Sequence, residues 1–184
     1  MIAVDSLKVK RARQGDADAF AALMQERKTD LYRMLYAYVR NQEDTLDIIH
    51  DGVYKAFLSI GKLKYPEYFN TWIIKIMMNT CRDHARRRRT RQQKENPYFE
   101  QSDLEQIPVE EVIEQDVISQ LDLWHAMETL QEELKAIVLL KYYQDLTLVE
   151  IAEVLSMPVG TVKSRLHRAL SLLKAQLKEG YHES

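Results

Sequence analysis

Cysteine is nearly absent from this chain, since Cys81 is the only one among its 184 residues. A single cysteine excludes an internal disulfide bond and any metal site built from several cysteines. Only five glycines and four prolines are present, which argues against a turn-rich all-β fold. No run of about 18 apolar residues occurs, and the N-terminal stretch 1–11 lacks the apolar core of a secretory signal peptide. We therefore expect a cytoplasmic protein.

The residues that are abundant favour helices. Hydrophobic residues make up 46% of the chain, an ordinary fraction for a folded protein, and the long segments rich in Leu, Ala, Met, Lys, Glu and Gln have high helix propensity. Apolar residues at helical spacing predict helices from Asp16 to about Val39, from Thr45 to Ile60, and from Phe69 into the arginine-rich stretch. The predicted fold class is all-α, with two small helical domains.

Charge is distributed unevenly along the chain. Residues 1–95 hold 19 Lys and Arg against 12 Asp and Glu, residues 96–120 hold seven acids and no Lys or Arg, and residues 121–184 hold seven basic and nine acidic side chains. We infer a first domain at 1–92, an acidic linker at 93–117 and a second domain at 118–184. The basic first domain points to a nucleic-acid partner.

The segment 146–170 has the pattern of a helix-turn-helix. A first helix is predicted over 147–155, a break at Ser156 to Gly160 because proline cannot continue a helix, and a second helix capped by Thr161. Its inward positions are Val162, Leu166, Ala169, Leu170 and Leu173. Its outward positions are Lys163, Ser164, His167 and Arg168, side-chain types that hydrogen-bond bases or phosphates in a DNA major groove. An ordinary helical hairpin with a solvated basic face is the alternative.

Three segments together resemble one protein family. They are Asp47-Ile-Ile-His-Asp-Gly-Val-Tyr-Lys-Ala-Phe57, the stretch from Phe69 to Arg87, and Pro158-Val-Gly-Thr-Val-Lys-Ser-Arg-Leu-His-Arg-Ala169. In this order they resemble the extracytoplasmic-function (ECF) group of bacterial RNA polymerase sigma factors, and the resemblance covers nearly the whole chain. It implies a region 2-like domain, which docks on the polymerase and opens the −10 element, and a region 4-like domain, which reads the −35 element.

The resemblance also assigns residues. Asp47, His50 and Asp51 would dock on the clamp helices of the largest polymerase subunit; His50 stands where glutamine is common, and Gly52 is costly inside a helix. The −10 element would be contacted by Lys62, Lys64, Tyr65 and Tyr68, around a flipped base, and by Asn79, Arg82, Asp83, Arg86 and Arg87, which share a helix face. The −35 duplex would be contacted by Lys141, Lys163, Ser164, His167 and Arg168. A solvated charge run is the alternative for the arginines, and a core position is expected for Trp72.

The implied partners are core RNA polymerase, promoter DNA and an anti-sigma factor, which in this family is often membrane-bound; the free protein is expected to be a monomer. No cofactor, metal or catalytic activity is expected, because the pairs His50–Asp47 and His84–Asp83 have no further metal-ligand residues near them in the sequence. The competing hypothesis is a stand-alone dimeric helix-turn-helix regulator, which would bind duplex sites with two-fold symmetry. Cys81 is expected to be an inert core thiol.

Overall fold

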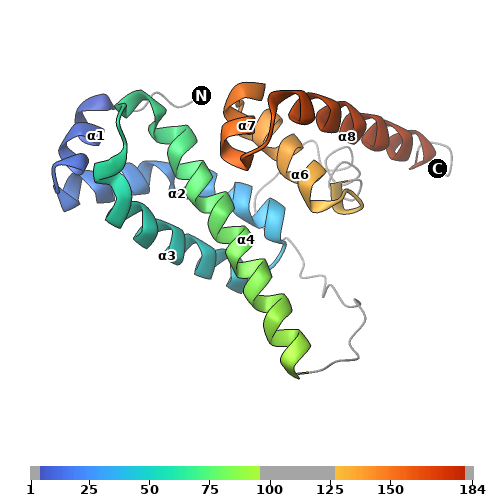
Figure 1. The fold of residues 1–184 in the computed structure, drawn as a ribbon, viewed down its shortest axis with the longest axis horizontal. Coiled ribbons are helices and arrows are strands. Elements are labelled where there is room, and N and C mark those ends of the chain that lie inside the picture. The colour runs from blue at the N-terminus through green and yellow to red at the C-terminus, as the bar shows by residue number, and fades with distance from the viewer. Residues whose placement is uncertain (1–4, 96–126, 181–184) are drawn as a thin grey trace, which may run out of the picture.

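The computed structural model describes residues 5–95 and 127–180, and all regular elements in these two ranges are helical (Figure 1). We call residues 5–95 the first module and residues 127–180 the second module. The first contains α1 (Ser6–Arg13), α2 (Ala17–Val39), α3 (Gln42–Ser59), the 3₁₀ turns Ile60–Lys62 and Pro66–Tyr68, and α4 (Phe69–Glu95). The second contains α6 (Glu132–Val138), a π-helical turn (Leu139–Tyr143), α7 (Leu148–Leu155) and α8 (Val159–Gly180). The all-α prediction is confirmed.

Short polar side chains begin several of these helices. The side chains of Asp5, Asp16 and Asn41 accept hydrogen bonds from backbone amides in the first turns of α1, α2 and α3, which would otherwise lack partners. Arg40 ends α2 in the left-handed conformation, with φ of 60°. Helix α2 runs without interruption from Ala17 to Val39.

Helix α3 presents a narrow stripe of small and apolar residues to α4. Its buried positions are Thr45, Ile48, Gly52 and Ala56. A Cβ atom added to Gly52 would lie 2.4 Å from Sδ of Met77 on α4, so the glycine allows a close approach of the two helices. Leu46 and Phe57 of α3 lie outside this stripe, since their side chains are 40% and 45% exposed.

The second module contains the predicted helix-turn-helix, formed by α7 and α8. Thr147 caps α7 in a reciprocal capping box with Glu150. The left-handed residue of the turn is Ser156, with φ of 54°. The prediction that Thr161 caps the second helix is wrong, since α8 begins at Val159. Val162, Ala169 and Leu173 are buried as predicted, but Leu170 is 39% exposed and lies at the edge of the buried stripe.

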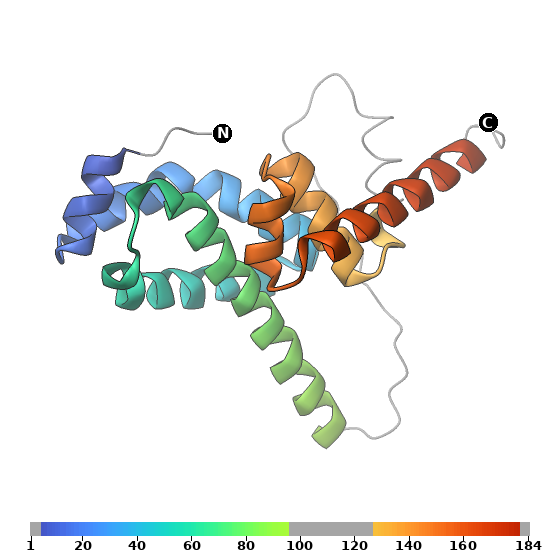
Figure 2. The ribbon, with the colours of Figure 1, turned by 45° about the horizontal axis from the view of Figure 1, so that its top comes forward.

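The two modules pack against each other. Helix α7 lies beside α4, and α8 points away from the first module (Figures 1 and 2). One hydrophobic cluster contains Ile73, Ile74 and Met78 of α4 together with Ile151 and Leu155 of α7. Helix α4 continues to Glu95, so it enters the segment predicted as linker. The rest of that linker and residues 118–126 of the predicted second domain lie outside the described residues.

Within residues 5–95 and 127–180, none of the helices combines the length and the apolar character needed to span a bilayer.

Candidate nucleic-acid interface

The outer face of α8 carries the four side chains predicted to meet duplex DNA. Lys163, Ser164, His167 and Arg168 are all exposed, because the buried residues Val162, Ala169 and Leu173 hold the opposite face of the helix on the module core. The spacing 163, 164, 167, 168 gathers the four side chains along one side of a helix. Their exposure leaves a basic ridge available to a DNA groove.

Two cationic side chains near this face, Lys141 and Arg165, make contacts within the second module. Lys141 lies on the π-helical turn, and its Nζ donates a hydrogen bond of 3.2 Å to the carbonyl oxygen of Leu146, just before α7. Arg165 pairs with Glu133 at 2.6 Å. Arg165 therefore ties α8 to α6, and Lys141 lies at the entrance to the helix-turn-helix.

A second candidate surface lies where the chain enters α4. Lys62 and Tyr68 are exposed on the two short 3₁₀ turns, and Lys64 and Tyr65 are exposed in the loop between them. The tyrosine rings meet edge to face with centroids 6.1 Å apart. These residues line a pocket together with Leu63, Thr71, Trp72 and Glu153. Trp72 was predicted as a core residue; it is partly buried and packs on the core while also lining this pocket. Aromatic rings beside lysines suit an unstacked base.

The polar face of α4 continues from that pocket. Asn79 and Arg82 are exposed, and Nη1 of Arg82 donates to Oδ1 of Asn79 at 3.3 Å. Asp83 accepts a hydrogen bond of 3.2 Å from Nζ of Lys55 and pairs with Arg86 at 3.2 Å. The carboxylate of Asp83 therefore orients cations, whereas Asn79 and Arg86 are exposed to solvent at the surface of α4.

Lys75 belongs to the same surface, although the sequence analysis did not select it. It lies one helical turn after Thr71 and one turn before Asn79, and its side chain is 34% exposed. Its i, i+4 relation to both residues was a signal in the sequence. Lys75 bridges the aromatic pocket and the arginine face of α4.

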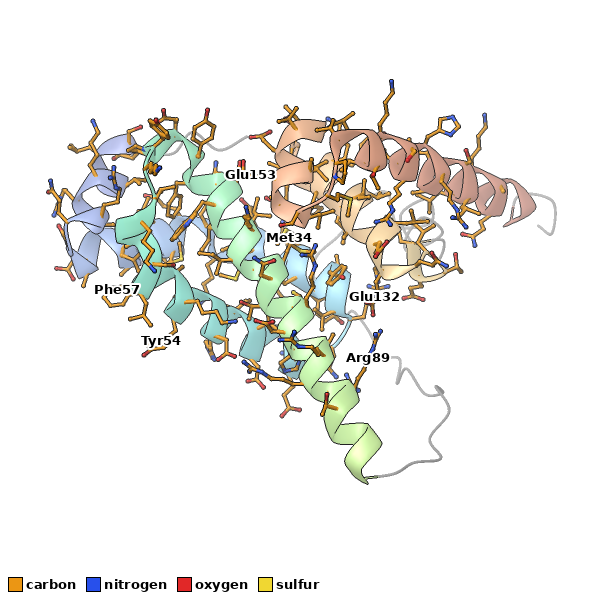
Figure 3. The ribbon with its side chains drawn as sticks, viewed as in Figure 1. Met34, Tyr54, Phe57, Arg89, Glu132 and Glu153 are labelled. Atoms are coloured by element: carbon orange, nitrogen blue, oxygen red, sulfur yellow. The ribbon has the colours of Figure 1, made fainter. Side chains whose placement is uncertain are left out.

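The exposed face of α3 holds the residues predicted to bind polymerase. Asp47, His50 and Asp51 are all solvent-exposed. Beside them lie the exposed apolar residues Leu46, Tyr54, Phe57 and Leu58; Figure 3 shows Tyr54 and Phe57 on the side of α3 away from the second module. Asp51 pairs with Arg87 of α4 at 3.7 Å. A surface of this mixed apolar and acidic character is suited to binding another protein.

Acidic residues of α7 face the α4 surface. The hydroxyl of Thr71 donates to Oε1 of Glu150 at 3.1 Å, Lys75 pairs with Glu153 at 3.7 Å, and Nη2 of Arg82 donates to the carbonyl oxygen of Leu155 at 3.3 Å. Figure 3 places Glu153 at the boundary between α7 and α4. The second module therefore contacts the same α4 face that carries Asn79.

Burial and hydrogen bonding shift the pKa values of two ionisable groups in this region, Glu150 and Cys81. Burial alone would raise the pKa of the Glu150 carboxyl, but hydrogen bonds from Thr147 and Thr71 and the charge of Lys141 lower it overall. Burial raises the pKa of the Cys81 thiol to about 12, and the residue is 3% exposed. Glu150 is thus held as a carboxylate, and Cys81 as an unreactive thiol.

Comparison with known families matches both modules. Residues 23–91 match the family described as Sigma-70 region 2, and residues 120–173 match the family described as Sigma-70, region 4.

Relatives extend along most of the chain. It is 34% identical over 152 residues to RNA polymerase sigma factor SigV of Bacillus subtilis, covering 83% of this chain and 87% of the relative. It is 28% identical to the ECF RNA polymerase sigma factor SigW of the same organism, covering 94% of this chain and 96% of the relative.

Two solved structures have the same fold at low sequence identity. CnrH, solved in complex with the cytosolic domain of CnrY, aligns with a TM-score of 0.69 at 19% identity, over 95% of this chain and 97% of its own. Sigma factor RpoE in complex with the anti-sigma factor NepR, from Bartonella quintana, aligns with a TM-score of 0.67 at 19% identity, over 84% of this chain and 95% of its own.

Proposed function

Because the chain belongs to the sigma-70 family of RNA polymerase subunits, within its ECF group, we propose a specific role for each of its exposed surfaces. As a sigma factor it binds core RNA polymerase and directs transcription initiation to promoters. The family is one of initiation factors, in which the polymerase carries out the chemistry. Because it binds core RNA polymerase, we infer that this protein is located in the cytoplasm.

Helix α8 reads the −35 element as duplex DNA. The observation that supports this assignment is the joint exposure of Lys163, Ser164, His167 and Arg168 on one face of the second helix of a helix-turn-helix. That helix is the one that enters the major groove in proteins with this motif. Lys141, at the entrance to α7, contacts the DNA backbone.

The loop before α4 and the polar face of α4 bind the opened −10 strand. Tyr65 and Tyr68 stack on or beside a flipped base, with Lys62 and Lys64 close to its phosphates, and this contact offsets the few kcal/mol lost when the base leaves the duplex. Asn79 reads a base edge, while Lys75, Arg82, Arg86 and Arg87 contact phosphates. Asp83 holds Arg86 and Lys55 in place.

The exposed face of α3 docks on the clamp helices of the largest polymerase subunit. Asp47, His50 and Asp51 supply polar contacts there, and the neighbouring Tyr54, Phe57 and Leu58 supply apolar area. We infer that an anti-sigma factor also binds this chain. The support for that partner is the shared fold with RpoE, which was solved bound to an anti-sigma factor.

Run-off transcription tests the function. Purified bacterial core polymerase is given a pool of genomic promoter fragments, with and without this protein, and we expect discrete new transcripts that share two short upstream elements. Arg168→Ala should reduce these transcripts, whereas Lys174→Ala, which removes another exposed cation from α8, should not. Absence of any new transcript, combined with duplex binding by a dimer, would favour the stand-alone regulator instead.

A further inference from the structure

We propose that Lys55 of α3 is a positioning residue for the −10 strand: it holds the carboxylate of Asp83 on α4 and thereby directs Arg86 toward a phosphate. The proposal rests on the phosphate contact assigned above to Arg86. Lys55 itself does not touch the strand, and it acts from the neighbouring helix, since α3 packs against α4 (Figure 1).

The ammonium group of Lys55 is fixed between two acceptors on α4. Its Nζ donates to Oγ1 of Thr80 and to Oδ2 of Asp83, each at 3.2 Å. Thr80 is a well-oriented acceptor, because its side chain is buried and its own hydroxyl donates to the carbonyl oxygen of Ile76 at 2.9 Å. Thr80 and Asp83 lie one turn apart and so share a face of α4. The Lys55 ammonium is therefore held at the boundary between α3 and α4.

The carboxylate of Asp83 divides its two oxygens between two cations. Oδ2 accepts a hydrogen bond from Lys55, and Oδ1 accepts one of 3.2 Å from Nη2 of Arg86. A guanidinium group has five N–H donors, so the bond to Asp83 leaves other donors of Arg86 for a phosphate. The side chain of Arg86 is 80% exposed, against 38% for Lys55. Arg86 is therefore the cation that a strand would meet, and Lys55 is the one that lies behind it.

The charge of Lys55 decides how strongly Asp83 holds Arg86. With Lys55 present, the carboxylate is shared by two cations, and the group of three carries a net positive charge. Without Lys55, Asp83 and Arg86 form a neutral pair. The unshared carboxylate then attracts Arg86 more strongly and repels a phosphate that approaches. Removal of Lys55 should therefore weaken the contact between Arg86 and the strand.

The next two arginines of α4 have the opposite arrangement. Asp51 of α3 pairs directly with Arg87 at 3.7 Å, and Asp44 of α3 pairs directly with Arg88 at 2.8 Å. The side chains of these arginines are 67% and 59% exposed, less than that of Arg86. Where α3 presents an acid, the arginine is held against α3. Where α3 presents Lys55, the arginine stays at the surface.

The test measures how holoenzyme variants bind a single strand. Core RNA polymerase is combined with the full-length protein, and fluorescence anisotropy follows a labelled non-template strand of a promoter that responds in run-off transcription. Binding is measured at several salt concentrations, because each phosphate contact with a single strand adds about 0.7 to the steepness of log K against log[salt]. Native gels establish that each variant forms holoenzyme, and circular dichroism melting establishes that it is folded.

Lys55→Met and Arg86→Ala are made separately and together, with Lys28→Met as the matched control. The control removes the same charge from an exposed position of α2. Relative to the control, we expect Lys55→Met to weaken strand binding about two- to five-fold, as expected for one exposed ion pair, and to lower the salt slope by about 0.7.

Arg86→Ala should have an effect of similar size, and the double variant should bind no more weakly than Arg86→Ala alone, because Lys55 acts through Arg86. Lys55→Arg should restore binding, since a guanidinium group also donates to a carboxylate.

An additive loss in the double variant would overturn the proposal, because Lys55 would then contact the strand itself. A lower melting temperature of Lys55→Met with unchanged affinity and salt slope would also overturn it, because Lys55 would then serve the fold alone. Failure of the proposed function gives a different result: Arg86→Ala alone would bind the strand as the unmodified protein does, and the positioning role would be excluded with it.

Discussion

Replacing Gly52 by alanine tests how closely α3 and α4 approach. Alanine inside a helix is favoured over glycine by about 0.5–1 kcal/mol, so the substitution would stabilise α3 if space were available. The new Cβ would lie 2.4 Å from Sδ and 3.1 Å from Cε of Met77, and Met77 is fully buried. Overpacking of this kind costs about 1–3 kcal/mol, which exceeds the helix gain. We expect Gly52→Ala to lower the free energy of unfolding by about 1 kcal/mol.

Urea denaturation followed by circular dichroism measures the change in unfolding free energy caused by Gly52→Ala. In a protein that also carries Met77→Ala, we expect this change to have the opposite sign. Met77→Ala removes the obstructing side chain, at a cost of about 2–5 kcal/mol. In that background, Gly52→Ala should stabilise the protein by about 0.5–1 kcal/mol, because the helix gain remains and the clash is gone. Stabilisation by Gly52→Ala in the presence of Met77 would show that α3 and α4 do not constrain this position.

Three further predictions concern binding, reactivity and pH. Arg168→Ala should weaken discrimination at one base of the −35 duplex by about 1–3 kcal/mol, measured on duplexes with single base changes; an equal loss at every base would exclude base reading by Arg168. Cys81, whose pKa burial raises to about 12, should react with an aromatic disulfide reagent at pH 8 only after unfolding in urea, and prompt reaction of the folded protein would contradict its burial. The lowered pKa of Glu150 means that its carboxylate stabilises the fold above the ordinary value of 4.5 and loses that effect as the pH falls through the lower, folded-state pKa. The difference in unfolding free energy between the wild type and Glu150→Gln should therefore shrink in acid, and a difference that stays constant from neutral pH to pH 3 would refute the assignment.

Sequence periodicity predicted the helices and the exposed basic face of α8, but not which residues of every helix face the core. The outward positions on α8 were identified because Val162, Ala169 and Leu173 alternate with them at helical spacing. On α3, apolar residues occur all around the helix, so periodicity could not show that Gly52 would face the core while Phe57 stayed exposed. A small residue at a close helix crossing carries no hydrophobic signal.

No local sequence pattern predicted the contact between the two modules. Arg82 and Leu155 are 73 residues apart, and Thr71 and Glu150 are 79 residues apart. An amphipathic pattern predicts that a face is buried or charged, but not which distant element it contacts. The spacing of Lys75 from Thr71 and Asn79 placed it on the same helix face, but its ion pair with Glu153 on another helix could not be predicted from that spacing.

The ion pair between Arg87 and Asp51 connects the arginine face of α4 to the exposed face of α3. Both side chains are more than half exposed, so the pair contributes less than about 1 kcal/mol. If polymerase binds Asp51 and a phosphate binds Arg87, as proposed, then either ligand breaks this ion pair and frees the other residue for its own ligand. By thermodynamic reciprocity the two ligands then assist each other by the same factor, at most a few-fold. The protein would thus hold polymerase slightly more tightly on promoter DNA than off it, and would loosen when the polymerase moves away from the promoter.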